Sequence, residues 1–226
     1  MLQNLINLFF PKACVGCNSF LLENEIVICT TCRHEIPLTN YHKTINNESF
    51  GKFYGRIPVE FAASLMYFHK KGIVQEMLHK LKYKGHQEIG RAIGDWYSED
   101  LKNCKEIENA DFIIPVPLHK KRLKNRGYNQ VTTFGETISK NLNIPLNDAV
   151  LVRNVYSKTQ TQKSFLGRSE SVESIFGINY DETLDNKHFI LIDDIITTGS
   201  TLESCGRELL KIPGAKLSIV CMAISQ

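Results

Sequence analysis

Apolar positions follow two periods along this 226-residue chain. Short, nearly continuous apolar runs predict buried strands at residues 62–68, 112–116, 189–192 and 216–224, and residues 148–152 are predicted to be extended. Apolar residues at helical spacing predict helices between them, at Ile73 to Leu81 and at residues 89–101, 129–142 and 202–210. Because strands alternate with helices, the pattern predicts an α/β fold with a Rossmann-like parallel sheet covered on both faces.

Two segments with little of this periodicity lie before the first strand. Residues 1–36 contain four closely spaced cysteines, which predict a compact module. Residues 37–58 contain Pro37, Gly51, Gly55 and few periodic apolar positions, which is typical of a linker. We therefore predict a cysteine module at 1–36, a linker at 37–58 and the α/β domain at 59–226.

The cysteines of the first module form two Cys-x-x-Cys pairs separated by eleven residues, namely Cys14, Cys17, Cys29 and Cys32. Two such pairs can place four thiolates tetrahedrally around zinc, and a site closed by four cysteines is structural rather than catalytic. The alternatives are a redox dithiol or disulfide pair, and a site in which His34 replaces one cysteine.

Composition narrows the class of protein only partly. The net charge of +3 does not indicate nucleic-acid binding by the whole chain, but residues 61–130 hold thirteen Lys and Arg against eight Asp and Glu. No apolar run approaches the roughly 18–20 residues of a membrane span. The apolar start is short and has no leading Lys or Arg, so it is a poor signal peptide. We expect a cytoplasmic protein with one locally basic face.

Candidate chemistry follows the apolar run at 189–192. That run ends in two adjacent carboxylates, and a loop of hydroxyls and one glycine precedes the next predicted helix; these residues are Asp193, Asp194, Thr197, Thr198, Gly199, Ser200 and Thr201. Ligands of open α/β sheets bind at the carboxyl edge, and the amides of a helix start attract phosphate. The carboxylates can accept ribose hydroxyls or hold Mg²⁺. The alternative is a buried strand and a capped helix without a ligand, although two unpartnered carboxylates there are costly.

A basic run lies between the second strand and the following helix. Five of its residues carry a positive charge: Lys120, Lys121, Arg122, Lys124 and Arg126. Such charge can neutralise a pyrophosphate or a nucleic-acid backbone, and the alternative is a solvated loop. Tyr83 and Tyr128 lie among basic residues, where they either stack on bases or pack half-buried.

The Asp-Asp and Thr-Thr-Gly-Ser-Thr elements resemble the fingerprint of the type I phosphoribosyltransferases. That resemblance implies that residues 197–201 grip the 5′-phosphate of phosphoribosyl pyrophosphate and that Asp193 and Asp194 face its ribose as catalytic residues. Together with the cysteine pairs and the segments 81–85, 114–130 and 151–168, the chain resembles the ComF family of competence proteins over nearly its whole length.

The ComF resemblance implies further residues and partners. Val116 and Pro117 would begin a pyrophosphate loop, and Arg168 would lie on a mobile loop that closes over the substrate. The family association implies handling of single-stranded DNA during natural transformation, with a partner helicase and with Mg²⁺ at the phosphoribosyl pyrophosphate site. Two alternatives stay open: an active phosphoribosyltransferase acting on an unidentified base or amine, and a site that senses this ligand and gates DNA binding.

Overall fold

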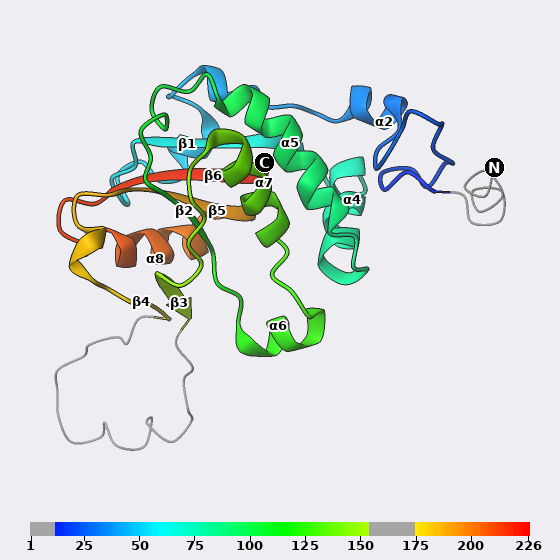
Figure 1. Cartoon of the computed structure of the whole chain (residues 1–226). Helices are drawn as coiled ribbons and strands as arrows, with labels where there is room; N and C mark the ends of the chain where they lie inside the picture. The colour runs from blue at the N-terminus through cyan, green and yellow to red at the C-terminus, as the bar shows by residue number, and fades with distance from the viewer. Residues whose placement is uncertain (1–11, 154–174) are drawn as a thin grey trace.

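A four-stranded parallel sheet forms the centre of the protein (Figure 1), whose computed structural model describes residues 12–153 and 175–226. The strand order is β1-β6-β5-β2, and every neighbouring pair is parallel. The predicted α/β class with a parallel sheet is therefore confirmed. The strands are β1 (Phe61–Phe68), β2 (Phe112–Pro115), β5 (His188–Ile196) and β6 (Lys216–Ser225).

Helices cover both faces of this sheet (Figure 1). Ile190 and Ile192 of β5 share a core with three helices, whereas Phe189 and Leu191 point to the other face and pack with the fourth helix. Because the central strand is buried on both faces, its sequence is continuously apolar rather than alternating. The first layer comprises α4 (Ile73–Tyr83), α5 (Glu88–Leu101) and α7 (Thr132–Leu142), and the second is α8 (Ser200–Leu209).

The carboxyl end of β5 extends further than the apolar run predicts. The strand continues through both aspartates to Ile196, because β6 pairs with it as far as the Ile196–Ile224 register. The next helix also starts earlier than predicted, at Ser200. The loop between them is therefore shortened to residues 197–199.

The basic run is helical. It forms α6 (Lys120–Arg126), a short helix that projects from the body between β2 and α7 (Figure 1). Its first turn is capped by the His119 side chain, which accepts a hydrogen bond from the Lys121 amide at 3.1 Å. Gly127 ends the helix in the left-handed region, at φ 78°. These terminal signals stabilise a helix that has almost no apolar periodicity.

Residues 37–58 pack against the sheet rather than away from it. They contain η1 (Tyr41–Lys43) and α3 (Glu48–Gly51), and the Tyr41 and Tyr67 hydroxyls join η1 to β1 at 2.9 Å. Phe53 is only 1% exposed and belongs, with Ile57, to the core under α8. This segment therefore forms part of the second layer.

The remaining described elements are small. Leu151–Arg153 forms β3 near the predicted extended segment, and it pairs antiparallel with β4 (Phe176–Ile178). A short helix, η2 (Glu182–Leu184), precedes β5, and α2 (Thr30–Glu35) belongs to the cysteine module. No helix in the described parts of the chain is both long and apolar enough to cross a membrane.

Candidate functional site

The two aspartates occupy consecutive positions near the carboxyl end of β5, so the pleat directs their side chains to opposite faces. Asp194 follows Ile190 and Ile192 on the face covered by α4, α5 and α7, whereas Asp193 lies on the face covered by α8. The pair can therefore contact groups from both layers of the protein at the edge where ligands of parallel sheets bind.

Asp194 is buried and fully engaged by two side chains. The Lys82 ammonium at the end of α4 lies 2.8 Å from its Oδ1, and the Gln130 Nε2 donates to its Oδ2 at 2.6 Å. A charge and a hydrogen bond offset the desolvation of this carboxylate. Neither Lys82 nor Gln130 was among the predicted catalytic or phosphoribosyl-binding residues, because their sequence context suggests only a basic surface and a turn.

Asp193 has a different environment. Burial and the neighbouring Asp194 charge raise the pKa of Asp193 to about 8, although the Asp194 amide donates to its Oδ1 at 2.8 Å. The raised pKa favours the protonated form of this carboxyl group near neutral pH. Binding of a divalent metal here would release that proton.

The predicted phosphate loop leads directly from β5 into α8. Its hydroxyl side chains, Thr197, Thr198, Ser200 and Thr201, are all exposed, whereas Gly199 is buried. The Thr198 Oγ1 lies 3.0 Å from the Ser200 Oγ, so these two hydroxyls lie together at the start of the helix. Amides and hydroxyls at a helix N-terminus can bind an anion.

Position 199 favours glycine for two reasons, the backbone conformation and a close neighbouring side chain. Its φ is 77°, a left-handed value that side chains rarely adopt. An added Cβ would lie 3.1 Å from the Phe53 Cε1 atom. The buried Phe53 ring therefore forms a wall that sets the position of the phosphate loop.

A second residue of the 37–58 segment also holds this loop. The Arg56 Nη1 donates to the Thr198 carbonyl oxygen at 2.9 Å, and its Nη2 forms an ion pair with Glu203 of α8. Arg207 contacts the same carboxylate at 2.8 Å and donates to the Arg56 carbonyl oxygen at 2.9 Å. Sequence reasoning missed Phe53 and Arg56; the one available signal was an aromatic residue and an arginine in a segment otherwise typical of a linker.

Two other residues predicted for the phosphoribosyl site, Val116 and Pro117, follow β2 at the same sheet edge. Val116 continues the pairing of β2, because its amide donates to the Ile192 carbonyl oxygen at 3.0 Å. Its own carbonyl oxygen accepts from the Asn129 Nδ2 at 3.0 Å, and the half-buried Pro117 follows. Arg168 and most of the predicted mobile loop lie outside the described residues.

The five basic residues predicted to bind nucleic acid all lie on α6. Lys120, Lys121, Arg122 and Lys124 are exposed. Arg126 is half-buried, and its Nη1 donates to the Gln130 Oε1 at 2.6 Å. The structure therefore separates four surface cations from one that is connected, through Gln130, to Asp194.

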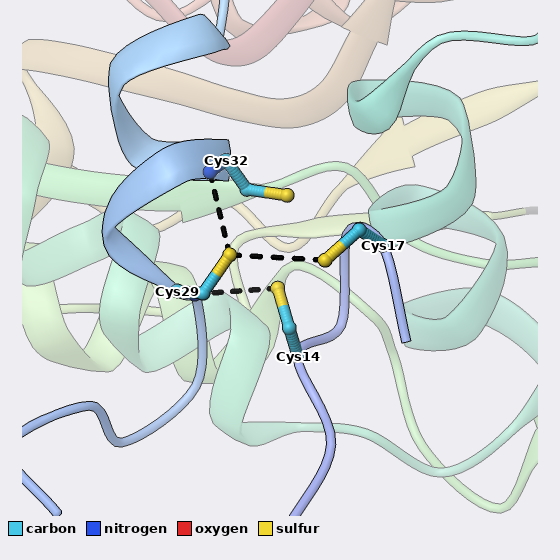
Figure 2. A group of neighbouring side chains, drawn as sticks. All are labelled: Cys14, Cys17, Cys29 and Cys32. Carbon is cyan, nitrogen blue, oxygen red and sulfur yellow. Dashed lines mark hydrogen bonds between the residues drawn. The ribbon is translucent and has the colours of Figure 1, made fainter. Parts of the chain in front are cut away.

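The four cysteines of the N-terminal module converge, with all four sulfurs within 4.8 Å of one another (Figure 2). A tetrahedral zinc site with metal–sulfur bonds of about 2.3 Å would separate its sulfurs by about 3.8 Å. The Sγ atoms of Cys17 and Cys29 lie 3.7 Å apart. The arrangement therefore fits a four-thiolate metal site, as the spacing predicted. His34 lies outside this cluster.

Backbone amides point at these sulfurs. The amides of Gly16 and Cys29 donate to the Cys14 Sγ at 3.3 and 3.2 Å, and the Cys32 amide donates to the Cys29 Sγ at 3.4 Å. Hydrogen bonds from Ser19 lower the pKa of Cys17 to about 6. Amide donors stabilise thiolates, which are the metal-binding form of cysteine.

The cysteine module packs closely on α4 and α5. A Cβ on Gly16 would lie 2.8 Å from the Ile73 Cγ2 atom, so a larger residue there would separate the module from α4. The Lys80 ammonium donates to the Val15 carbonyl oxygen at 3.0 Å. The guanidinium of Arg33 lies 4.7 Å from the centre of the Trp96 ring on α5.

Comparison with known proteins identifies the class of the α/β domain. The family model described as phosphoribosyl transferase domain matches residues 132–225, which include β5, the phosphate loop and α8. The sheet, its two helical layers and this match define a type I phosphoribosyltransferase fold.

Curated relatives extend the similarity beyond this domain. Competence protein F of Haemophilus influenzae is 24% identical over 90% of this chain and 93% of its own. Competence protein ComFC of Bacillus subtilis is 26% identical over 88% of this chain and 78% of its own. The DNA utilization protein YhgH of Shigella flexneri is 25% identical over 65% of each chain. Over most of its length the chain is therefore similar to competence proteins F and ComFC, and it combines a phosphoribosyl transferase domain with a cluster of four cysteines.

Proposed function

We propose that this protein is a ComF-type competence protein that binds phosphoribosyl pyrophosphate and handles single-stranded DNA during natural transformation. The proposed binding of phosphoribosyl pyrophosphate rests on the exposed hydroxyl loop between β5 and α8. Phe53 and Arg56 contact this loop and hold it in position. The second part rests on the relatives named as competence and DNA utilization proteins. We place this activity in the cytoplasm.

The residues at the sheet edge suit the parts of this ligand. The hydroxyls and amides of Thr197, Thr198, Ser200 and Thr201, with Gly199, would bind the 5′-phosphate. Asp193 and Asp194 would face the ribose, and Asp193 offers carboxylate oxygens, the ligands that Mg²⁺ prefers. Val116, Pro117 and Arg168 complete the proposed binding set on the pyrophosphate side.

Zinc is the metal proposed for the four-cysteine site. Four thiolates at tetrahedral separation favour Zn²⁺ and leave no open coordination position for catalysis. The module packs on α4, the helix that also carries Lys82. We therefore assign zinc a structural role and expect about one ion per chain.

The cations of α6 suit a phosphodiester backbone. Four of them are exposed on one short helix, and among described residues Lys120, Lys121, Arg122 and Lys124 have no carboxylate within 4 Å. Cations without acidic partners can neutralise DNA phosphates and so release the counterions that are condensed on the DNA, which makes binding dependent on salt. A competence helicase is a further proposed partner.

An active phosphoribosyltransferase is the alternative. The observation in its favour is that both carboxylates and the whole hydroxyl loop are present at the expected edge. Phosphoribosyl transfer needs an acceptor, and turnover does not follow from the fold alone. A screen of bases and amines for release of pyrophosphate separates this activity from ligand binding without turnover.

Calorimetric titration tests the proposal. Phosphoribosyl pyrophosphate with Mg²⁺ should bind the zinc-loaded protein, and changing both Asp193 and Asp194 to Asn should weaken binding without unfolding the chain. The control is Asp95→Asn, which removes one carboxylate from α5, remote in sequence from β5. Unchanged affinity in the double variant would reject the site, and no binding by folded wild-type protein would reject the ligand.

A further inference from the structure

A pocket lies between the end of α4 and helix α6. Its volume is about 520 Å³, and its lining holds three cations, two tyrosines and no acidic residue. The lining residues are Lys82, Tyr83, Gly85, Arg122, Asn125, Arg126 and Tyr128. A concave site with excess positive charge and aromatic rings suits an anion that carries a flat ring.

The aromatic and cationic groups of this pocket are already placed together. Tyr83 is 62% exposed, and the Arg126 guanidinium lies 4.9 Å from the centre of its ring. The Arg126 Nη2 also donates to the Tyr83 hydroxyl at 3.3 Å. Rings and guanidinium planes of this kind stack on unpaired bases, while neighbouring cations hold the backbone phosphates. Bases inside a duplex cannot present a ring face to such a pocket.

Two of the pocket residues also contact Asp194 or its hydrogen-bond partner Gln130. Lys82 reaches from the pocket to the Asp194 Oδ1 at 2.8 Å. Arg126 holds the Gln130 Oε1 at 2.6 Å, and this fixes the Gln130 amide so that its Nε2 donates to Asp194. The pocket and the carboxyl end of β5 are therefore connected by an ion pair and by a chain of hydrogen bonds.

We propose that this pocket binds a nucleotide unit of single-stranded DNA, and that Lys82 couples its occupancy to ligand binding at Asp194. The inference rests on the proposed function, because it takes phosphoribosyl pyrophosphate and single-stranded DNA as the two ligands. What it adds is a defined pocket for the DNA and a single lysine shared between the sites.

The sign of the coupling follows from the charges. A DNA phosphate in the pocket attracts Lys82 and leaves Asp194 free to accept a ribose hydroxyl or a Mg²⁺-bound water. Conversely, a ligand that engages Asp194 releases the Lys82 ammonium into the pocket. Each ligand therefore favours the Lys82 position that the other needs, and linkage requires the two effects to be equal in free energy.

Fluorescence anisotropy of a labelled oligothymidylate of about 16 nucleotides, the upper end of single-strand site sizes, measures this coupling. The Mg²⁺ concentration is held constant, and titrations are run with and without saturating phosphoribosyl pyrophosphate. We expect the wild type to bind the oligonucleotide at least about fivefold more tightly with the ligand, the lower end of typical allosteric coupling. Calorimetry should find the same factor for phosphoribosyl pyrophosphate when the oligonucleotide is present.

Two variants distinguish the specific effect of Lys82 from a general effect of losing one positive charge. Lys82→Gln removes a cation of the pocket, so it should weaken oligonucleotide binding and also lose the enhancement, and its oligonucleotide affinities with and without phosphoribosyl pyrophosphate should agree. Lys84→Gln removes the same charge from an exposed position outside the pocket and should keep the enhancement. Arg122→Gln changes an exposed residue and should weaken DNA binding more than Lys84→Gln does, which tests the pocket even if Lys82→Gln does not fold.

The outcomes distinguish this inference from the proposed function. If both ligands bind wild-type protein without affecting one another, or if phosphoribosyl pyrophosphate weakens DNA binding, the coupling is wrong and the proposed function stands. Enhancement that persists in Lys82→Gln likewise rejects Lys82 as the link. If phosphoribosyl pyrophosphate does not bind at all, the proposed function fails and the coupling fails with it. An oligouridylate that binds as tightly as the DNA would reject DNA as the specific partner.

Discussion

Replacing Gly199 by Ala should damage the phosphate loop more than its backbone conformation alone explains. Gly199 has a φ of 77° in the phosphate loop, and Gly127 has a φ of 78° at the end of α6. An alanine in the left-handed region costs about 1–2 kcal/mol at either position. The two sites differ in their surroundings, since a Cβ on Gly127 meets no atom within 4 Å.

At Gly199 a steric contribution is added. The new Cβ would lie 3.1 Å from the Phe53 Cε1 and 3.4 Å from its Cζ, and Phe53 is too deeply buried to move away freely. Forcing a methyl group into a packed site costs about 1–3 kcal/mol. We therefore expect Gly199→Ala to lose about 2–5 kcal/mol of unfolding free energy and Gly127→Ala about 1–2 kcal/mol.

Urea unfolding measures the difference, and calorimetry with phosphoribosyl pyrophosphate measures its effect on the loop. Gly199→Ala should also lose ligand affinity, whereas Gly127→Ala should not. A double variant with Phe53→Leu should recover part of the Gly199→Ala loss, as expected for two residues that touch. Equal losses in the two alanine variants, with no recovery in the double variant, would refute the role of Phe53 as the wall of the loop.

Three other changes test the electrostatics and the metal site. The raised pKa of Asp193 means that the folded state holds more protons than the unfolded state between pH 3.8 and about 8. The free energy of unfolding should therefore fall as the pH rises through that window, and urea unfolding of Asp193→Asn should show a flatter profile; identical profiles would contradict the pKa. Chelation should alter the emission of Trp96, the single tryptophan, because Arg33 of the cysteine module lies over its ring, and unchanged emission after metal removal would show that the module needs no metal to dock. Neutralising the five cations of α6 should weaken oligonucleotide binding and reduce its salt slope by about one for each DNA phosphate that the helix no longer neutralises; an unchanged slope would place the DNA elsewhere.

Local sequence patterns were enough to predict much of the fold and the central residues of the candidate site. The apolar run before Asp193, the hydroxyls after it and the two Cys-x-x-Cys pairs are continuous in sequence, so their arrangement is predictable from spacing alone. The structure adds the faces on which the two carboxylates lie. The strand extends past both aspartates because of pairing with β6, a partner that the run itself does not reveal.

Partners from distant segments were not predictable. Lys82 precedes α5 in the sequence and Gln130 follows it, and both side chains contact Asp194. Arg56 and Glu203 are 147 positions apart, so no spacing rule connects them. The helical form of α6 was missed for another reason, since its signals are a histidine cap and a terminal glycine rather than an apolar stripe.

The position of Phe53 and Arg56 has a consequence for synthesis of the chain on the ribosome. Both residues emerge early, but the loop and the Glu203 carboxylate that they contact emerge only after three of the four strands of the sheet. Until then the Phe53 ring has no α8 to cover it, and it remains an apolar surface on an incomplete protein. A fragment that starts at residue 59 would keep every hydroxyl of the phosphate loop but would lose Phe53 and Arg56, the two residues that hold the loop in position.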